Sequence, residues 1–191
     1  MDKKTKKKIE ALTFETAFKY PFKRPAGLLN ILWILVPIIG WFALIGYNIR
    51  IIKNFVKGNF KELPLFNFSQ DLNLGFFMFL KLIPFIVIIT VINWAFGKIP
   101  FVGFLGTLFI SLFIVPVLII NFFVKETIES YFDFNKVKFV FDNLEDYVIT
   151  VLKSIGLGII FLLMFVILVG IPASTFTKNI FFADFYRRYV K

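Results

Sequence analysis

The sequence predicts an all-α integral membrane protein with about four membrane-embedded helices and further amphipathic helices at the membrane surface. Apolar residues make up 59% of the 191 residues, and 29 residues are phenylalanine. Soluble domains contain only about 45–50% apolar residues. Charged residues cluster between long uncharged stretches, which are close to the roughly 20 residues that a helix needs to cross a bilayer. We therefore expect residues 1–191 to form a single helical membrane domain.

The first 25 residues predict a basic, interfacial segment. Lysines dominate residues 1–8, and Phe14 and Phe18 lie on one side of the helix that follows. Pro25 ends this segment. The polar residues after the lysines differ from the apolar stretch of a signal peptide, so we expect a surface helix and not a signal sequence.

The first apolar segment runs from Ala26 to about Tyr47 and carries no charge. At a rise of about 1.5 Å per residue, it is long enough to cross a hydrocarbon core about 30 Å thick. Pro37 and Gly40 stand in its middle, so it forms either a complete span or a hairpin that returns to the same side. With a hairpin, more of the basic residues lie on one side of the membrane than with a complete span, as most membrane proteins show. The backbone at the turn of a hairpin would, however, need hydrogen-bond partners in the middle of the bilayer. Both alternatives place the N-terminus in the cytoplasm.

Later apolar segments complete the predicted architecture. A very short turn at residues 97–100 joins two of them into an antiparallel hairpin, and an amphipathic helix from residue 136 leads into the last. The tail, residues 177–191, combines aromatic and basic residues, which is typical of an interfacial anchor. The three segments cover residues 74–96, 101–124 and 151–172.

A short internal repeat accompanies these segments. Pro37-Ile38-Ile39-Gly40 is similar to Pro100-Phe101-Val102-Gly103. An inverted repeat would favour a transporter. In a sequence this rich in apolar residues, however, chance explains four similar positions.

The sequence contains no histidine and no cysteine. Their absence removes most transition-metal sites and the Ser–His and Cys–His pairs of nucleophilic catalysis. We therefore predict no metal site, no cofactor and no catalytic residues. The net charge of +10 resides in basic residues beside the apolar segments, which favours anionic lipid headgroups over nucleic acid.

A basic stripe follows the first apolar segment. Arg50, Lys53 and Lys57 recur at spacings that place them on one face of a helix. Such a face predicts binding of anionic lipid headgroups, to which each basic residue contributes about 1 kcal/mol. The alternative is that the stripe only sets the topology and contacts any lipid.

The polar connector after this stripe contains Glu62, Pro64 and Asp71. The two acids predict either an acid pair that could hold a cation or an ordinary solvated loop in which Pro64 sets a turn. The acids are well separated and lack a histidine partner, so the solvated loop is the stronger hypothesis.

Polar residues are rare inside the apolar segments. Lys81 lies near one end of its segment, where its side chain can reach the interface. Asn93 and Asn121 lie at opposite ends of an antiparallel hairpin, so each is expected to bond to a different neighbour. Ser154 and Gly158 form a small-residue face that fits either internal helix packing or a homo-oligomer.

Short motifs connect these features to a known family. Gly46-Tyr47 lies at the end of the first apolar segment, and the basic stripe follows it. Leu63-Pro64 comes next, and Gly75 lies near the start of the next apolar segment. Residues 131–136, with Tyr147 beyond them, lead into the later amphipathic helix. In these motifs the chain resembles the prokaryotic membrane-protein family catalogued as domain of unknown function 4013. The resemblance implies the architecture and assigns no activity, substrate or cofactor.

These observations predict a multi-pass protein of the cytoplasmic membrane that acts as a non-catalytic accessory, assembly or lipid-interacting component. Its partners are membrane lipids, and a protein partner or a second copy is also open. The alternative function is a small transporter or channel subunit, which needs polar residues that converge on a pathway. An enzyme would have to rely on carboxylates, Lys81 or a tyrosine.

Overall fold

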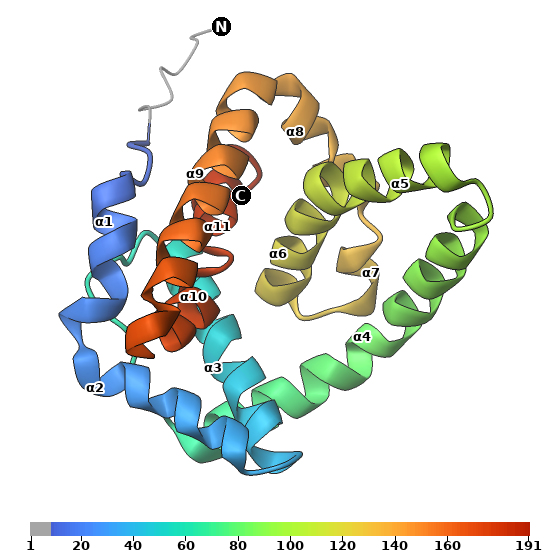
Figure 1. Ribbon diagram of the computed structural model, residues 1–191. Helices are drawn as coiled ribbons and strands as arrows, with labels where there is room; N and C mark the ends of the chain where they lie inside the picture. Colours follow the sequence, from blue (N-terminus) through green and yellow to red (C-terminus); the bar gives the residue numbers. More distant parts are fainter. Residues whose placement is uncertain (1–8) are drawn as a thin grey trace, which may run out of the picture.

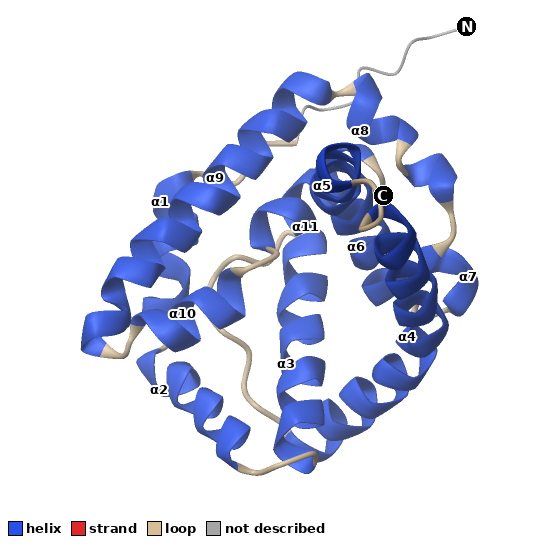
Figure 2. Ribbon diagram, turned by 45° about the vertical axis from the view of Figure 1, so that its right-hand side comes forward, coloured by secondary structure: helices blue, strands red, loops and turns tan. Residues whose placement is uncertain are grey.

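A computed structural model of the protein describes residues 9–191, apart from the side chains of Pro100 and Val102. The lysine-rich part of the predicted N-terminal segment, residues 1–8, lies outside the described residues. All regular elements within this range are helical (Figures 1 and 2). In chain order they are α1 (Phe14–Lys19), η1 (Tyr20–Lys23), α2 (Pro25–Leu28), η2 (Leu29–Leu35), α3 (Ile39–Val56), α4 (Phe68–Phe96), α5 (Pro100–Phe109), η3 (Ile110–Ile114), α6 (Val115–Lys125), α7 (Ile128–Tyr131), η4 (Phe134–Lys136), α8 (Lys138–Asp142), α9 (Leu144–Leu163), η5 (Met164–Ile167), α10 (Gly170–Thr177) and α11 (Ile180–Tyr189).

The predicted class, an all-helical membrane protein, is confirmed. Three helices are long and apolar enough to cross a membrane: Phe68–Phe96, Gly103–Lys125 and Leu144–Ile167. The first apolar segment is not a fourth helix of this kind, because it is divided into two shorter parts.

The first apolar segment forms a hairpin that breaks at Val36–Ile38. The residue before a proline avoids helical backbone angles, and Val36 is extended, with φ −95° and ψ 101°. Ile38 then has φ 64°, and α3 begins at the next residue. The chain enters through α2 and η2 and returns through α3, so the break falls where the hairpin alternative placed it.

Two further hairpins follow, and all three share one close contact. The first hairpin comprises residues 25–56, the second residues 68–125 and the third residues 144–177. Shortly after each turn, a glycine approaches a carbonyl of the preceding arm so closely that a Cβ would lie 1.9–2.1 Å from its oxygen. Only glycine fits such an approach. The pairs are Gly40 with Trp33, Gly103 with Phe96, and Gly170 with Phe161.

The short internal repeat was expected to arise by chance, but its glycines make the same structural contact. Gly40 and Gly103, its last residues, occupy equivalent places after the turns of the first and second hairpins. The third hairpin uses the same contact, although its turn at Leu168 and Val169 lacks the proline.

The first and second hairpins meet where α3 crosses α4. A Cβ on Gly46 would lie 1.9 Å from the carbonyl oxygen of Asp71, and one on Gly75 would lie 1.8 Å from that of Phe42. Two glycines therefore let the backbones of these helices touch, as small residues do in membrane helix pairs. Figure 1 shows α4 leaving this crossing away from α3.

The C-terminal helix lies inside the protein. Ile180, Phe185 and Tyr186 of α11 are buried, and α11 packs against α3, α6 and α9 (Figure 1). The sequence predicted an interfacial anchor at this tail, but its aromatic side chains contact other helices. The N-terminal helix packs on the same core, because Phe14 stacks on Phe181 and Phe18 stacks on Phe161.

The second hairpin divides between an exposed and a buried part. Apolar side chains of α4 point outward, among them Trp94, which is 68% exposed. After α5 the chain changes direction at the π-helical turn η3 and Pro116, both of which bend helices. The following helix, α6, is mostly buried between the other elements, so it serves as core (Figure 1).

The α3–α4 crossing can be tested with a methyl group. Gly46→Ala places a Cβ against the backbone of α4, so we expect the free energy of unfolding to fall by about 1–3 kcal/mol. The measurement is denaturant-induced unfolding in detergent, followed by circular dichroism. Gly158→Ala is the matched control, because no atom lies within 4 Å of its Cβ position. The free energy of unfolding of the control should rise by up to about 1 kcal/mol, because alanine has a higher helix propensity than glycine. Equal effects of the two substitutions would contradict the crossing.

Candidate functional site

A buried ion pair lies beside the α3–α4 crossing. Arg50 Nε donates to Asp71 Oδ1 at 2.5 Å, and Arg50 Nη2 donates to Asp71 Oδ2 at 2.7 Å. Asp71 is fully buried, and its Oδ2 also accepts the Asn67 backbone N–H at 2.9 Å. Two parallel bonds to one carboxylate make this a bidentate, charge-assisted contact. Arg50, a predicted headgroup ligand, therefore has a protein partner.

The connector binds both arms of the first hairpin through its carbonyl groups. Arg24 donates to Leu63 O at 3.1 Å, and Arg50 donates to Leu65 O at 2.6 Å. Tyr47 OH donates to Pro64 O at 3.0 Å. The predicted site residue Pro64 thus contributes a carbonyl acceptor. The other predicted acid, Glu62, is exposed, whereas Asp71 is enclosed, and no ion pair among the described residues involves Glu62.

A second cluster forms around the end of α6. Lys53 makes an ion pair with Glu126, and Lys81 Nζ donates to the Glu126 carbonyl at 2.8 Å. Glu126 has φ 60° and ends α6. Lysines stabilise the carbonyls at a helix C-terminus. Lys81 therefore caps a helix end, while Lys57, the third residue of the basic stripe, is exposed.

The predicted intramembrane asparagines bond to separate neighbours. Asn121 is buried; its Nδ2 donates to Ser130 O at 2.6 Å, and its Oδ1 accepts from Tyr186 OH at 2.6 Å. This connects α6 to α7 and α11. Burial raises the pKa of Tyr186 to about 12, so its hydroxyl keeps its proton and donates at neutral pH. Asn93 Oδ1 accepts from Thr107 Oγ1 at 3.4 Å across the second hairpin.

The predicted packing pair on α9 has two different surroundings. Ser154 Oγ donates to Lys178 O at 3.4 Å, which connects the two arms of the third hairpin. Gly158 has no atom within 4 Å of the place where a Cβ would stand. The pair therefore does not form one packed face within the described chain.

An acid on α11 organises a network that sequence reasoning did not single out. Asp184 accepts from Arg187 at 2.6 Å, from Arg188 at 3.0 Å, and from the Leu12 backbone N–H at 3.0 Å. Arg187 also donates to Glu10 O at 2.7 Å. The signal was present, because an acid followed three and four residues later by arginines is the spacing of helical ion pairs.

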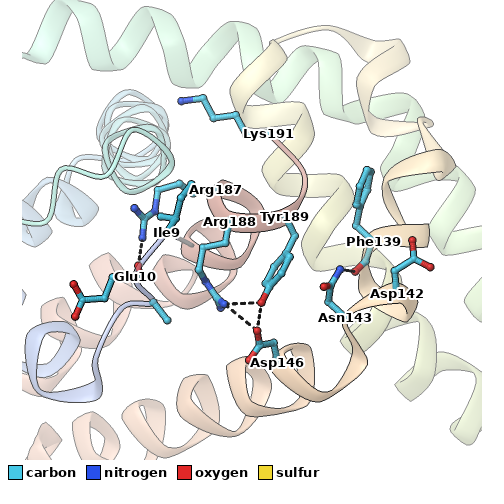
Figure 3. A pocket seen from close by; sticks show the side chains of 11 residues that line it. Ile9, Glu10, Phe139, Asp142, Asn143, Asp146, Arg187, Arg188, Tyr189 and Lys191 are labelled. Carbon is cyan, nitrogen blue, oxygen red and sulfur yellow. Dashed lines mark hydrogen bonds and ion pairs between the residues drawn. The ribbon is translucent and has the colours of Figure 1, made fainter. Parts of the chain in front are cut away.

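Beside this network lies an open groove of about 1180 Å³ (Figure 3). Arg188 donates to Asp146 at 3.2 Å inside it, and the Tyr189 hydroxyl bonds to the same carboxylate. Its arginines thus already bind acids or backbone carbonyls of the chain. Among residues 9–191, no group of three or more acids is placed to hold a metal ion.

Comparison with known proteins gives a family match. A family model described as "Protein of unknown function (DUF4013)" matches residues 29–170. The matched range contains the Arg50–Asp71 pair and ends before α11. No curated protein and no solved structure matches the chain.

The Arg50–Asp71 pair can be tested by removing one charge. Asp71→Asn leaves the guanidinium of Arg50 without its carboxylate in a buried position, so we expect a loss of about 3–5 kcal/mol in the free energy of unfolding. The control is Glu15→Gln, because the Glu15–Lys19 pair has side chains that are 73% and 61% exposed. We expect no measurable loss there, since exposed ion pairs contribute little. A similar stability for both variants would show that the buried pair is dispensable.

Two buried tyrosines provide a matched test of hydroxyl partners. Tyr20 is fully buried, burial raises its pKa, and its hydroxyl has no hydrogen-bond partner among the described residues. Tyr20→Phe should leave the free energy of unfolding unchanged or raise it, because it removes an unsatisfied group. Tyr186→Phe should lower it by about 1–3 kcal/mol, because Asn121 loses its donor. Chemical unfolding measures both, and the reverse order would contradict the assignment.

Proposed function

Because the chain belongs to the family described as DUF4013, which carries no assigned activity, we propose its function from the structure: a non-catalytic accessory or assembly component that is held in the membrane by direct contact with lipid. The observation that carries this proposal is the outer surface of the hairpins. Along the apolar segments most exposed side chains are apolar, and Lys81, Asn93 and Asn121 bond within the protein.

The apolar surface is extensive. Large apolar side chains are exposed along α4, around each hairpin turn and along the second half of α9. The most exposed are Val166 at 90%, Phe101 at 75% and Leu35 at 74%. Contiguous apolar surface of more than a few hundred Å² marks a site of contact with a membrane or a protein. Contact with lipid supplies the apolar surroundings that water cannot.

The polar groups support a structural component over a transporter. A transport pathway needs polar side chains that line a common route. Lys81, Asn93 and Asn121 instead bond to Glu126, Thr107 and Ser130, at different places in the protein. None of these bonds leaves a row of polar groups along the exposed helices. The bonding of the acids also supports a non-enzymatic role, because Asp71 is bound by Arg50, and Asp146 and Asp184 are bound by Arg188.

The cellular setting belongs to the proposal. We place the chain in the cytoplasmic membrane with its N-terminus in the cytoplasm, because basic residues flank the apolar segments on the cytoplasmic side of most membrane proteins. Lys57, which is exposed at the end of α3, is the residue of the basic stripe best placed to contact anionic headgroups. A partner protein or a second copy could bind beside the lipid.

Reconstitution of the full chain tests the proposal. The probe is vesicles of phosphatidylethanolamine and phosphatidylglycerol with entrapped pH-sensitive and potassium-sensitive dyes. We expect the protein to stay with the vesicles after alkaline carbonate washing and to conduct protons and potassium no faster than protein-free vesicles. The Lys81→Ala variant should behave identically in flux. A flux well above the protein-free control that Lys81→Ala abolishes would overturn the proposal in favour of a transporter.

A further inference from the structure

Each hairpin is bracketed by two basic residues. Between the members of each pair the sequence carries no other charge, except Lys98 in the turn of the second hairpin. Basic residues mark the level where a segment enters the headgroups. The pairs are Arg24 with Arg50, Lys81 with Lys125, and Lys153 with Lys178.

The two ends of each hairpin are held at the same level by hydrogen bonds. In the first, Arg24 and Arg50 both donate to the connector, at Leu63 O and Leu65 O. In the second, Lys81 donates to Glu126 O, next to Lys125. In the third, Ser154 donates to Lys178 O. Each hairpin therefore begins and ends on the same side.

The first and third hairpins lie side by side. Tyr47 in α3 packs edge to face on Phe176 in α10, with ring centroids 5.2 Å apart. Both aromatic residues lie near the basic ends of their hairpins. In Figures 1 and 2 the turn between η2 and α3 and the turn before α10 both lie toward the lower part of the view.

The three turns differ in chemistry. The second turn contains Gly97 and Lys98, and Lys98 Nζ lies 4.2 Å from the ring centroid of Trp94. Lysine and tryptophan are typical of the headgroup region. The first and third turns, residues 36–38 and 167–169, carry only apolar side chains. They lack any group that would favour water or headgroups.

The backbone of these apolar turns bonds to itself. In the first turn, Val36 N donates to Trp33 O at 3.1 Å and Gly40 N donates to Val36 O at 3.0 Å. Trp41 Nε1 donates a hydrogen bond to Ile34 O at 2.9 Å. In the third turn, Leu168 N donates to Phe165 O at 2.9 Å and Val169 N donates to Ile167 O at 2.7 Å. Hydrocarbon tolerates a turn only when its polar backbone groups are satisfied in this way.

The short arms cannot cross a bilayer. The eight residues of α10 are about 12 Å long. The four residues of α2 and the seven of η2 together reach about 20 Å. A hydrocarbon core is about 30 Å thick. In the second hairpin, the part of α4 from Lys81 to Phe96 rises about 23 Å, and the long side chains of Lys81 and Lys98 extend from its two ends toward the headgroups.

We propose that the first and third hairpins are re-entrant: they enter and leave the bilayer from one side, and their turns bind the acyl chains at mid-depth. The second hairpin alone carries its turn to the opposite surface, where Lys98 meets the headgroups. The occupant of both apolar turns is the hydrocarbon of the bilayer. This inference rests on the proposed function only in that it requires residence in the membrane.

Single cysteines test the inference, because the chain has none of its own. Val36→Cys marks the first turn, and Val166→Cys marks the residue directly before the third turn. Lys98→Cys marks the second turn, and Lys57→Cys marks the basic side. All four positions are exposed, so folding should be preserved, and gel filtration in detergent checks it. The full chain is expressed in cells, and sealed vesicles of either orientation are treated with a membrane-impermeant maleimide.

We expect Lys57→Cys and Lys98→Cys to label only from opposite sides. Val36→Cys and Val166→Cys should label from neither side and react fully once detergent is added. Labelling of either turn from the side that labels Lys98→Cys would overturn the inference, because that hairpin would then cross. Labelling from the side that labels Lys57→Cys would also overturn it, because the turn would lie in water.

Depth-dependent quenching identifies the occupant. Bimane attached at Val36→Cys or Val166→Cys should be quenched several-fold more strongly by lipid spin-labelled in the middle of the acyl chain than by lipid labelled at the headgroup. Bimane at Lys57→Cys should show the reverse order. Disulfide formation between turns of two molecules, with loss of quenching by lipid, would instead assign the surface to a second copy and overturn the inference. Flux is not measured here, so this result is independent of the test of the proposed function.

Discussion

The structure depends on the place where α3 and α4 cross. Gly46 and Gly75 bring the two backbones into contact, and the Arg50–Asp71 pair lies one turn away on the same helices. Burying two charges costs free energy that their attraction only partly returns, so such a pair specifies an arrangement more than it stabilises one. Here it joins α3 to α4 beside the contact of their backbones, where the second hairpin leaves the first. Arg50 also binds the connector at Leu65 O, so the loop between the helices is held by the same side chain.

The hydrocarbon imposes the second constraint. A chain that turns inside a bilayer must satisfy its own backbone, keep charges at its ends and place apolar side chains outside. In our proposal the first and third hairpins meet this constraint, with apolar turns and with basic residues at both ends, whereas the second hairpin carries Lys98 in its turn. All three hairpins have a glycine that lets the returning arm touch the entering one. Helix α6, which is the buried part of the second hairpin, and α11 contribute to the core against which the hairpins pack. The three turns share this glycine contact, so the apolar surface is divided into three similar hairpins.

Much of this architecture could be predicted from the sequence, because the relevant signals are local. Apolar length, flanking charge and the proline at position 37 indicate the helices and the break in the first segment. The Arg50–Asp71 pair could not be predicted, because it exists only after two helices cross, and the spacing of Arg50 with Lys53 equally fits a lipid-facing stripe. The tail containing Phe185 and Tyr186 has a similar ambiguity, because its pattern predicts an interfacial anchor although both side chains are buried. Aromatic residues mixed with arginines have the same pattern at a membrane surface and in a core whose arginines are paired, as they are here with Asp184.

The central claim is that the hairpins contact lipid while α11 and the Arg50–Asp71 pair contact only protein. The most direct measurement is a residue-by-residue map of acyl-chain contacts, obtained by nuclear magnetic resonance on the full chain in a lipid nanodisc with cross-peaks to lipid methylene protons. The account predicts cross-peaks from residues 34–38, 83–96 and 162–168, and none from Phe181, Phe185 or Tyr186. Strong lipid cross-peaks from α11, with none from the turns of the first and third hairpins, would contradict it.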